Sequence, residues 1–107
     1  MEQRRTRRFK LTLPLSITRA GAERVTFAGT TNNISSSGVL FTSEREPDLG
    51  SPIEYIITLN CEGAQMVNLR CVGKVLRAHQ IREGQEAQPR SFEVAATLER
   101  YEFIRPR

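Results

Sequence analysis

The 107-residue sequence has no tryptophan, one histidine and two cysteines, and this composition limits the metal and disulfide sites that it can form. A single histidine, His79, excludes a metal site built on a histidine cluster, and we expect it at the surface. Cys61 and Cys71 stand ten residues apart and form no CxxC pair. We therefore expect two buried free thiols in a reducing cytosol, with a disulfide between neighbouring strands as the alternative.

Long apolar runs are also missing. No stretch of about 18 apolar residues occurs, so we expect no membrane span. The basic N-terminus is not followed by an apolar h-region, so the chain does not read as carrying a signal peptide. Hydrophobic residues make up 38% of the chain, which favours one domain with a thin core. These features predict a single cytoplasmic domain.

Motifs for catalysis are lacking as well. No GxxxxGK[ST] phosphate loop is present, and the serines Ser35, Ser36 and Ser37 have no base near them in sequence. The acidic residues are scattered, mostly at strand ends or solvent positions. We expect a binding protein without a metal or cofactor, and not an enzyme.

The net charge of +4 is concentrated at one end. Five of the sixteen basic residues and one of the twelve acidic residues fall within residues 1–10, so eleven of each remain elsewhere. A basic arm on a neutral body points to an anionic partner, which could be a nucleic acid, a nucleotide or a membrane surface. The alternative is a solvated tail that only aids solubility.

Most of the remaining sequence alternates between apolar and polar residues with a period of two. This pattern is typical of strands with one buried face, and Pro14 indicates an edge or a bulge in the first of them. About six strands with short turns and no amphipathic helix predict an all-β fold, an antiparallel barrel or sandwich. The expected strands cover about 9–17, 25–31, 39–41, 53–59, 67–75 and 92–98, with a polar turn at 32–38, a flexible loop at 79–89 and a short helical turn at 101–107.

Two segments carry residues suited to ligand binding. Arginines fill most of residues 4–8, and a guanidinium can pair bidentately with phosphate or with the O6/N7 edge of guanine. Asn33, Ser35 and Gly38 belong to a polar turn, where a glycine permits positive φ or close approach of a ligand. Taken alone, this second segment is also compatible with an ordinary Asx/Ser turn.

In combination, the two segments resemble the PilZ domain family. The first has the RxxxR spacing from Arg4 to Arg8, and the second, about 25 residues later, has the (D/N)xSxxG pattern in its Asn variant. The resemblance continues through 50–53, 71–77, 94–96 and 101–103, so it covers nearly the whole chain.

The resemblance implies a six-stranded antiparallel β-barrel, residues 10–107, with a flexible ligand-binding arm, residues 1–9. It implies binding of the bacterial second messenger cyclic di-GMP by Arg4, Arg5 and Arg8 of the arm and by Asn33, Ser35 and Gly38 of the turn. Such a receptor would signal to an effector protein, which at family level belongs to motility, polysaccharide or pilus machinery.

Two alternatives remain from the residues themselves. One is a single-stranded nucleic-acid-binding barrel with a basic arm, which would need exposed aromatic platforms. Phe9, Tyr55 and Phe92 fall instead in phase with apolar strand faces, and Phe27 and Phe41 have apolar neighbours, so we expect no DNA or RNA partner. The other is a PilZ-like interaction module that binds no nucleotide, against which the intact arginines argue.

Overall fold

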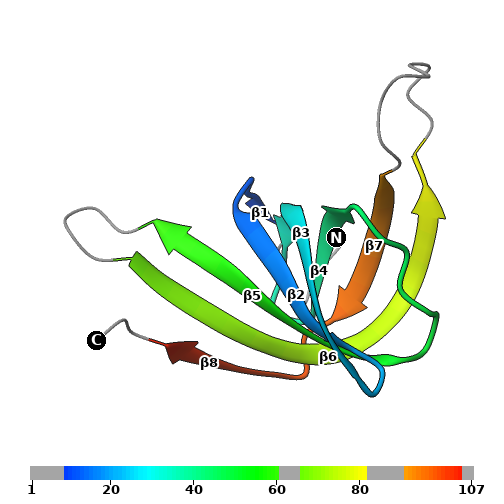
Figure 1. The fold of residues 1–107 in the computed structure, drawn as a ribbon. Coiled ribbons are helices and arrows are strands. Elements are labelled where there is room, and N and C mark those ends of the chain that lie inside the picture. The colour runs from blue at the N-terminus through cyan, green and yellow to red at the C-terminus, as the bar shows by residue number, and fades with distance from the viewer. Residues whose placement is uncertain (1–8, 61–65, 82–90, 105–107) are drawn as a thin grey trace, which may run out of the picture.

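The computed structural model describes residues 9–60, 66–81 and 91–104, and these form one antiparallel β-barrel with additional strands (Figure 1). Every described element is a strand. Their bounds are β1 (Phe9–Lys10), β2 (Pro14–Ala20), β3 (Glu23–Ile34), β4 (Gly38–Ser43), β5 (Pro52–Asn60), β6 (Met66–Gln80), β7 (Phe92–Thr97) and β8 (Arg100–Ile104).

Six strands close the barrel. The sheet runs in the order β3-β2-β5-β6-β7-β4, and pairing of β4 with β3 joins its two ends. All of these pairings are antiparallel. Closure leaves no free edge within the barrel wall, so β1 and β8 are added at its margins, against β3 and β6 respectively. The predicted all-β, six-stranded antiparallel barrel is confirmed.

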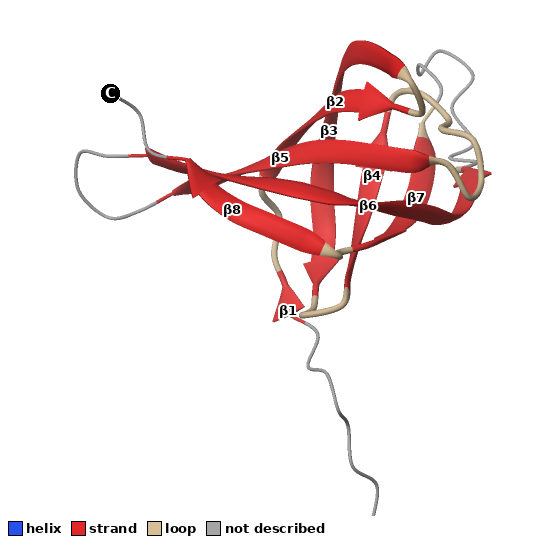
Figure 2. Cartoon of the chain, turned by 90° about the horizontal axis from the view of Figure 1, so that it is seen from below, coloured by secondary structure: helices blue, strands red, loops and turns tan. Residues whose placement is uncertain are grey.

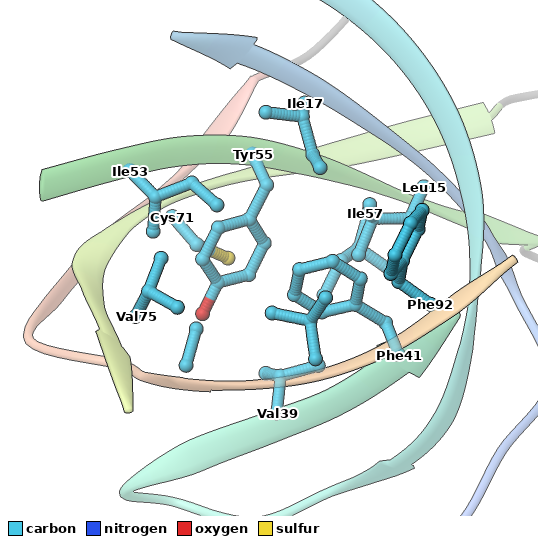
Figure 3. Close-up of a cluster of buried hydrophobic side chains, with 12 residues drawn as sticks. Leu15, Ile17, Val39, Phe41, Ile53, Tyr55, Ile57, Cys71, Val75 and Phe92 are labelled. Carbon is cyan, nitrogen blue, oxygen red and sulfur yellow. The ribbon is translucent and has the colours of Figure 1, made fainter. Parts of the chain in front are cut away.

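The core consists of the inward side chains of these strands (Figure 3). Tyr55 and Phe41 are fully buried, with ring centroids 5.8 Å apart, and the Tyr55 hydroxyl donates to the Thr97 carbonyl at 3.1 Å. The other core residues are apolar: Leu15, Ile17, Val39, Ile53, Ile57, Cys71, Val75, Phe92, Val94 and Ala96. Cys71 is a free thiol, as expected, whereas Cys61 lies outside the described residues.

Two predictions at the ends of the chain are wrong. The helical turn expected at 101–107 is a strand as far as Ile104, because the edge of β6 at Asn68–Val72 offers hydrogen-bonding partners to Arg100–Ile104. The strand expected over 9–17 is split into β1 and β2, and Leu11, expected on the buried face, is 42% exposed. Pro14 begins β2, a position that proline tolerates.

Gly73 lies where β6 passes Thr97 at close range. A Cβ at this position would collide with the Thr97 carbonyl oxygen, so only glycine fits. The same threonine accepts the Lys74 backbone N–H at 2.8 Å through its hydroxyl. This contact marks the point at which β6 changes partner, from β8 on one side of Gly73 to β7 on the other.

Candidate functional site

The NxSxxG segment covers the end of β3, a three-residue turn and the start of β4. Ser35 is buried, and its hydroxyl accepts hydrogen bonds from the backbone N–H groups of Ser37 at 3.3 Å and Gly38 at 3.2 Å. It also donates to the Gly38 carbonyl at 3.3 Å, and the Ser35 backbone N–H reaches the same carbonyl at 2.9 Å. The Ser35 side chain therefore fixes the conformation of the turn.

Gly38 packs closely against β7. It begins β4 and pairs with Thr97 on β7, and positive φ among the described residues occurs only at Gly21 (65°) and Gly50 (77°). Of the two reasons expected for this glycine, positive φ is therefore wrong. A Cβ on Gly38 would lie 3.0 Å from the Ala96 carbonyl oxygen, so a larger residue would push the turn away from β7.

A β-bulge at Asn32 decides which way Asn33 faces. Thr31 pairs with the inward residue Phe41. The next register pair joins Asn33 to Leu40, which occupies one of the outward positions of β4. Without the bulge, Thr31 and Asn33 would share the inward face, since strand side chains alternate with a period of two. The Asn32 amide nitrogen donates to the Thr42 hydroxyl at 3.2 Å beside this bulge. Asn33 is thereby turned to the outer surface, where it is half-buried.

A second bulge, at Leu76 of β6, turns Arg77 to the outer surface. Val75 pairs with Ala96, and both are buried, whereas Arg77 pairs with Ala95 on the outer face of β7. The extra residue between Val75 and Arg77 moves the arginine out of phase with the core. Arg77 is exposed, and among the described residues it has no ion-pair partner.

The two bulges bring one row of outward side chains together across five strands. The consecutive register pairs are Lys10 with Asn33, Asn33 with Leu40, Leu40 with Ala95, and Ala95 with Arg77. We call these five residues the outer row. A shallow pocket of about 130 Å³ lies over four of them, Asn33, Leu40, Ala95 and Arg77, and its lining also includes Ser35, Ser37 and Gly38 of the turn.

The composition of the outer row suits an anionic ligand with flat rings. A cation stands at each end of the row, Lys10 and Arg77, and of these Arg77 lines the pocket; no carboxylate is found among the described residues that line it. The small side chain of Ala95 lies between Leu40 and Arg77, so the floor of the pocket is low and apolar. A guanidinium, an amide and an apolar floor can together bind phosphate, a base edge and a ring face.

Thr31 holds the first strand against this site. It is fully buried, and its hydroxyl accepts the Leu13 backbone N–H at 2.9 Å and donates to the Leu11 carbonyl at 2.5 Å. The Thr31 backbone N–H donates to the Leu13 carbonyl at 2.9 Å. These bonds pair the Leu11 carbonyl and both backbone groups of Leu13 between β1 and β2. β1 itself pairs with Asn33 and Ile34, and Figure 2 shows β1 near the end of β3.

The structure thus brings together three of the six predicted binding residues, Asn33, Ser35 and Gly38. Arg4, Arg5 and Arg8, and the predicted flexible arm to which they belong, lie outside the described residues except for Phe9, which is in β1. Sequence reasoning missed Arg77. The apolar pair at 75 and 76 directly before it interrupts the alternation of β6, and that interruption is the signal that could have revealed it.

Other kinds of site find no support in the parts of the chain that are described. Within 9–60, 66–81 and 91–104, no three His, Cys, Asp or Glu residues group as metal ligands. The same ranges hold no helix long and apolar enough to cross a membrane. His79 is exposed, as expected, and lies 3.5 Å from a Glu93 carboxylate oxygen.

Comparison with known proteins gives one result. The sequence model of a family described as the PilZ domain matches residues 2–103, which is essentially the whole chain. No curated protein and no solved structure matches it.

Proposed function

The chain belongs to the PilZ domain family, a family of cyclic di-GMP receptors, and from this premise we propose that it binds cyclic di-GMP between its N-terminal arginines and the outer row. The observation that carries the proposal is the pairing of β1 with β3. Phe9 pairs with Ile34 and Lys10 with Asn33, so β1 lies directly beside the NxSxxG motif. The arginine segment ends at Arg8, the residue that precedes this strand.

Chain length makes this arrangement feasible. Arg8 is bonded directly to Phe9, and Arg4 precedes it by five residues. An extended chain spans at most about 3.6 Å per residue, so Arg4 has a reach of about 18 Å from Phe9. The outer row crosses four strand spacings of about 4.8 Å each, or about 19 Å. The arginines of residues 4–8 can therefore extend along most of the row.

The chemistry of the ligand matches these groups. Cyclic di-GMP carries two phosphates and two guanines, and arginine pairs with both phosphate and the guanine edge. We assign those contacts to Arg4 and Arg8 with help from Arg5, and we add Arg77 at the opposite end of the row, where β6 holds its backbone. Asn33 accepts from guanine through its carbonyl oxygen, with less strength than the charged carboxylate of the commoner Asp variant.

Ser35 and Gly38 act on the ligand mainly through the shape of the turn. The three hydrogen bonds of the Ser35 hydroxyl stay within the motif, and Gly38 keeps the turn close to β7. A ligand contact by Ser35 remains a prediction. The strength of such a contact is limited because the Ser35 hydroxyl already accepts two backbone N–H groups and donates to the Gly38 carbonyl.

We further propose that the domain is a cytoplasmic adaptor that passes the signal to an effector protein. The free buried thiol of Cys71 supports a reducing compartment. Ordering an arm costs roughly 1–2 kcal/mol per fixed residue, so contacts with the ligand must exceed that cost. The closed arm then presents a surface that the free protein lacks, and this difference is what an effector can recognise.

Substitution of Arg8 by lysine tests the proposal, because lysine keeps the charge but has no planar fork. We expect Arg8→Lys to weaken cyclic di-GMP binding by about 5- to 150-fold, the equivalent of roughly 1–3 kcal/mol. The measurement is calorimetric titration at one salt concentration.

Arg7→Lys is the matched control, since Arg7 stands between the motif positions in the same segment, and we expect it to bind nearly as the wild type does. Equal, small losses at both positions would contradict specific contacts and leave only a diffuse basic tail. Titration with a single-stranded oligonucleotide covers the nucleic-acid alternative, for which a steep dependence on salt would be expected.

A further inference from the structure

A second surface lies where β8 extends the sheet beyond the barrel. Figure 1 shows β8 beside the first half of β6, on the outside of the barrel. Residues 68–72 of β6 pair with β8 on one side and with β5 on the other. In the described part of the chain β8 pairs with β6 alone, so its second edge presents backbone N–H and C=O groups that no described strand satisfies.

One face of this sheet carries a line of alternating charges. Arg19 of β2 lies 3.8 Å from Glu54 of β5, and Glu54 lies 3.6 Å from Arg70 of β6. Arg70 in turn pairs with Glu102 of β8 through one carboxylate oxygen, Oε2. The line ends with an acid at the open edge, so the next strand in the sheet would continue it by placing a cation opposite Glu102.

The other face is apolar at the same edge. Tyr101 pairs with Cys71 and Phe103 with Leu69, so both aromatic rings lie on the sheet face that forms the core inside the barrel. Each ring residue is 60% exposed, and their centroids are 6.2 Å apart in an edge-to-face arrangement. An exposed aromatic pair beside an unpaired strand edge is a surface that a partner strand would cover.

The sequence of β8 is complementary to itself in one antiparallel register. A two-fold axis perpendicular to the sheet pairs residues symmetrically about one central residue. With Tyr101 at the centre, Arg100 of one copy faces Glu102 of the other, twice. Arg100 is exposed and has no ion-pair partner among the described residues, so it supplies the cation that the line of charges lacks.

The neighbouring symmetric registers are worse. With Glu102 at the centre, two like charges would lie directly opposite each other. With Phe103 at the centre, Glu102 would face the apolar Ile104. A shift by one residue would place polar side chains on the aromatic face.

We propose that a second copy of this chain covers the open edge, by antiparallel pairing of β8 with β8 centred on Tyr101. The dimer forms one continuous sheet through both protomers, with Tyr101 beside its counterpart on one face and two Arg100–Glu102 pairs on the other. The dimer is independent of the nucleotide site, because none of Arg100, Tyr101 and Glu102 belongs to the outer row.

Sedimentation equilibrium of the full chain without nucleotide tests the dimer. We expect the mass to rise with concentration from 12.1 kDa towards twice that value. Arg100→Glu puts acids at both positions 100 and 102, and Glu102→Arg puts bases at both. For each variant alone, the dissociation constant of the dimer should be at least about tenfold higher than for the wild type, because both pairs between the copies become like-charged.

An equimolar mixture of the two variants restores opposite charges at both pairs, so it should dimerise more tightly than either variant alone. Arg24→Glu makes the same charge change as Arg100→Glu at an exposed residue of β3, and it should leave the wild-type association unchanged. A wild type that stays at 12.1 kDa at every concentration, or a mixture no tighter than its components, would overturn the proposal. Circular dichroism of each variant confirms that it is folded, and cyclic di-GMP titration of the same samples tests the proposed function separately.

Discussion

Thr31 shows how a single polar residue inside the barrel holds the segment between β1 and β2. Its side chain is fully buried, yet it has both a donor and an acceptor partner on the backbone at Leu11 and Leu13. Buried polar groups stabilise a protein only when they are satisfied in this way. In the sequence Thr31 is one of several threonines of β3, and nothing local distinguishes it from its neighbours.

Thr31→Val keeps the shape of the side chain and removes the hydroxyl. The Leu13 N–H and the Leu11 carbonyl would then lose their partner, and we expect the free energy of unfolding to fall by roughly 1–3 kcal/mol in urea denaturation. Thr26→Val is the control, because Thr26 is exposed on the same strand. Equal stabilities for the two variants would show that the Thr31 hydroxyl does not hold the segment between β1 and β2.

Because the Cys71 thiol is buried, we expect the free energy of unfolding to depend on pH in the alkaline range. Burial raises the pKa of its thiol from 9.0 to about 12. Burial, followed by the charges of Cys71 and Glu99, raises the pKa of the Tyr55 hydroxyl above its usual value of 10.0. Both groups ionise more readily in the unfolded chain. The stability that Cys71 contributes is complete below about pH 9 and is lost as the pH rises towards 12, and the contribution of Tyr55 is complete below about pH 10 and decreases above it.

The free energy of unfolding should therefore decrease between pH 9 and pH 11 in the wild type. Cys71→Ala is less stable at every pH, because it removes a buried side chain, but it should lose less stability over that interval. Urea denaturation at pH 8, 9, 10 and 11 measures both slopes. A steeper decline in the variant than in the wild type would contradict the assignment to this thiol.

At the scale of the elements, the period-two pattern predicted the positions of the barrel strands well. Tyr55 and Phe92 are core residues as their phase indicated, and Phe41 is one as its apolar neighbours indicated. Phe27, expected in the core on the same ground, is half-buried beneath Arg45, whose guanidinium lies 4.7 Å from the ring centroid. The pattern did not predict β8, because five residues at a strand edge acquire their structure from pairing with β6 rather than from their own propensity.

The bulges at Asn32 and Leu76 explain why the site could be predicted only in part. The motif spacing predicted Asn33, Ser35 and Gly38 as binding residues. The outward direction of Asn33, however, depends on a register shift against β4. Arg77 joins them through a separate shift between β6 and β7. Such shifts arise from pairing between distant strands, so single-strand periodicity does not contain them.

Ala95 tests whether the outer row is the binding surface. Its side chain faces outward, between Leu40 and Arg77, so Ala95→Leu adds volume to the pocket and not to the core. We expect at least about tenfold weaker binding of cyclic di-GMP with a melting temperature close to that of the wild type. Unchanged affinity together with unchanged stability would move the binding surface away from this row.

At the scale of the whole molecule, the closed barrel has an additional strand at each of two margins. β1 lies at one margin, where its residues Phe9 and Lys10, which directly follow the arginine segment, pair with Ile34 and Asn33. β8 lies at another margin, on the outer side of β6. The all-β barrel and its family could be predicted from strand pattern and motifs together. The role of β8 could not, because it depends on which edges remain after the barrel closes.

The central claim is that this domain recognises cyclic di-GMP as a specific ligand, and calorimetric titration of the full wild-type chain tests it most directly. GMP offers one guanine and one phosphate, and cyclic di-AMP offers the same ring of phosphates with adenines. We predict saturable binding of cyclic di-GMP, with at least about 100-fold weaker binding of both controls, because guanine edges and paired phosphates are needed together. No saturable heat with cyclic di-GMP, or equal affinity for cyclic di-AMP, would contradict the account.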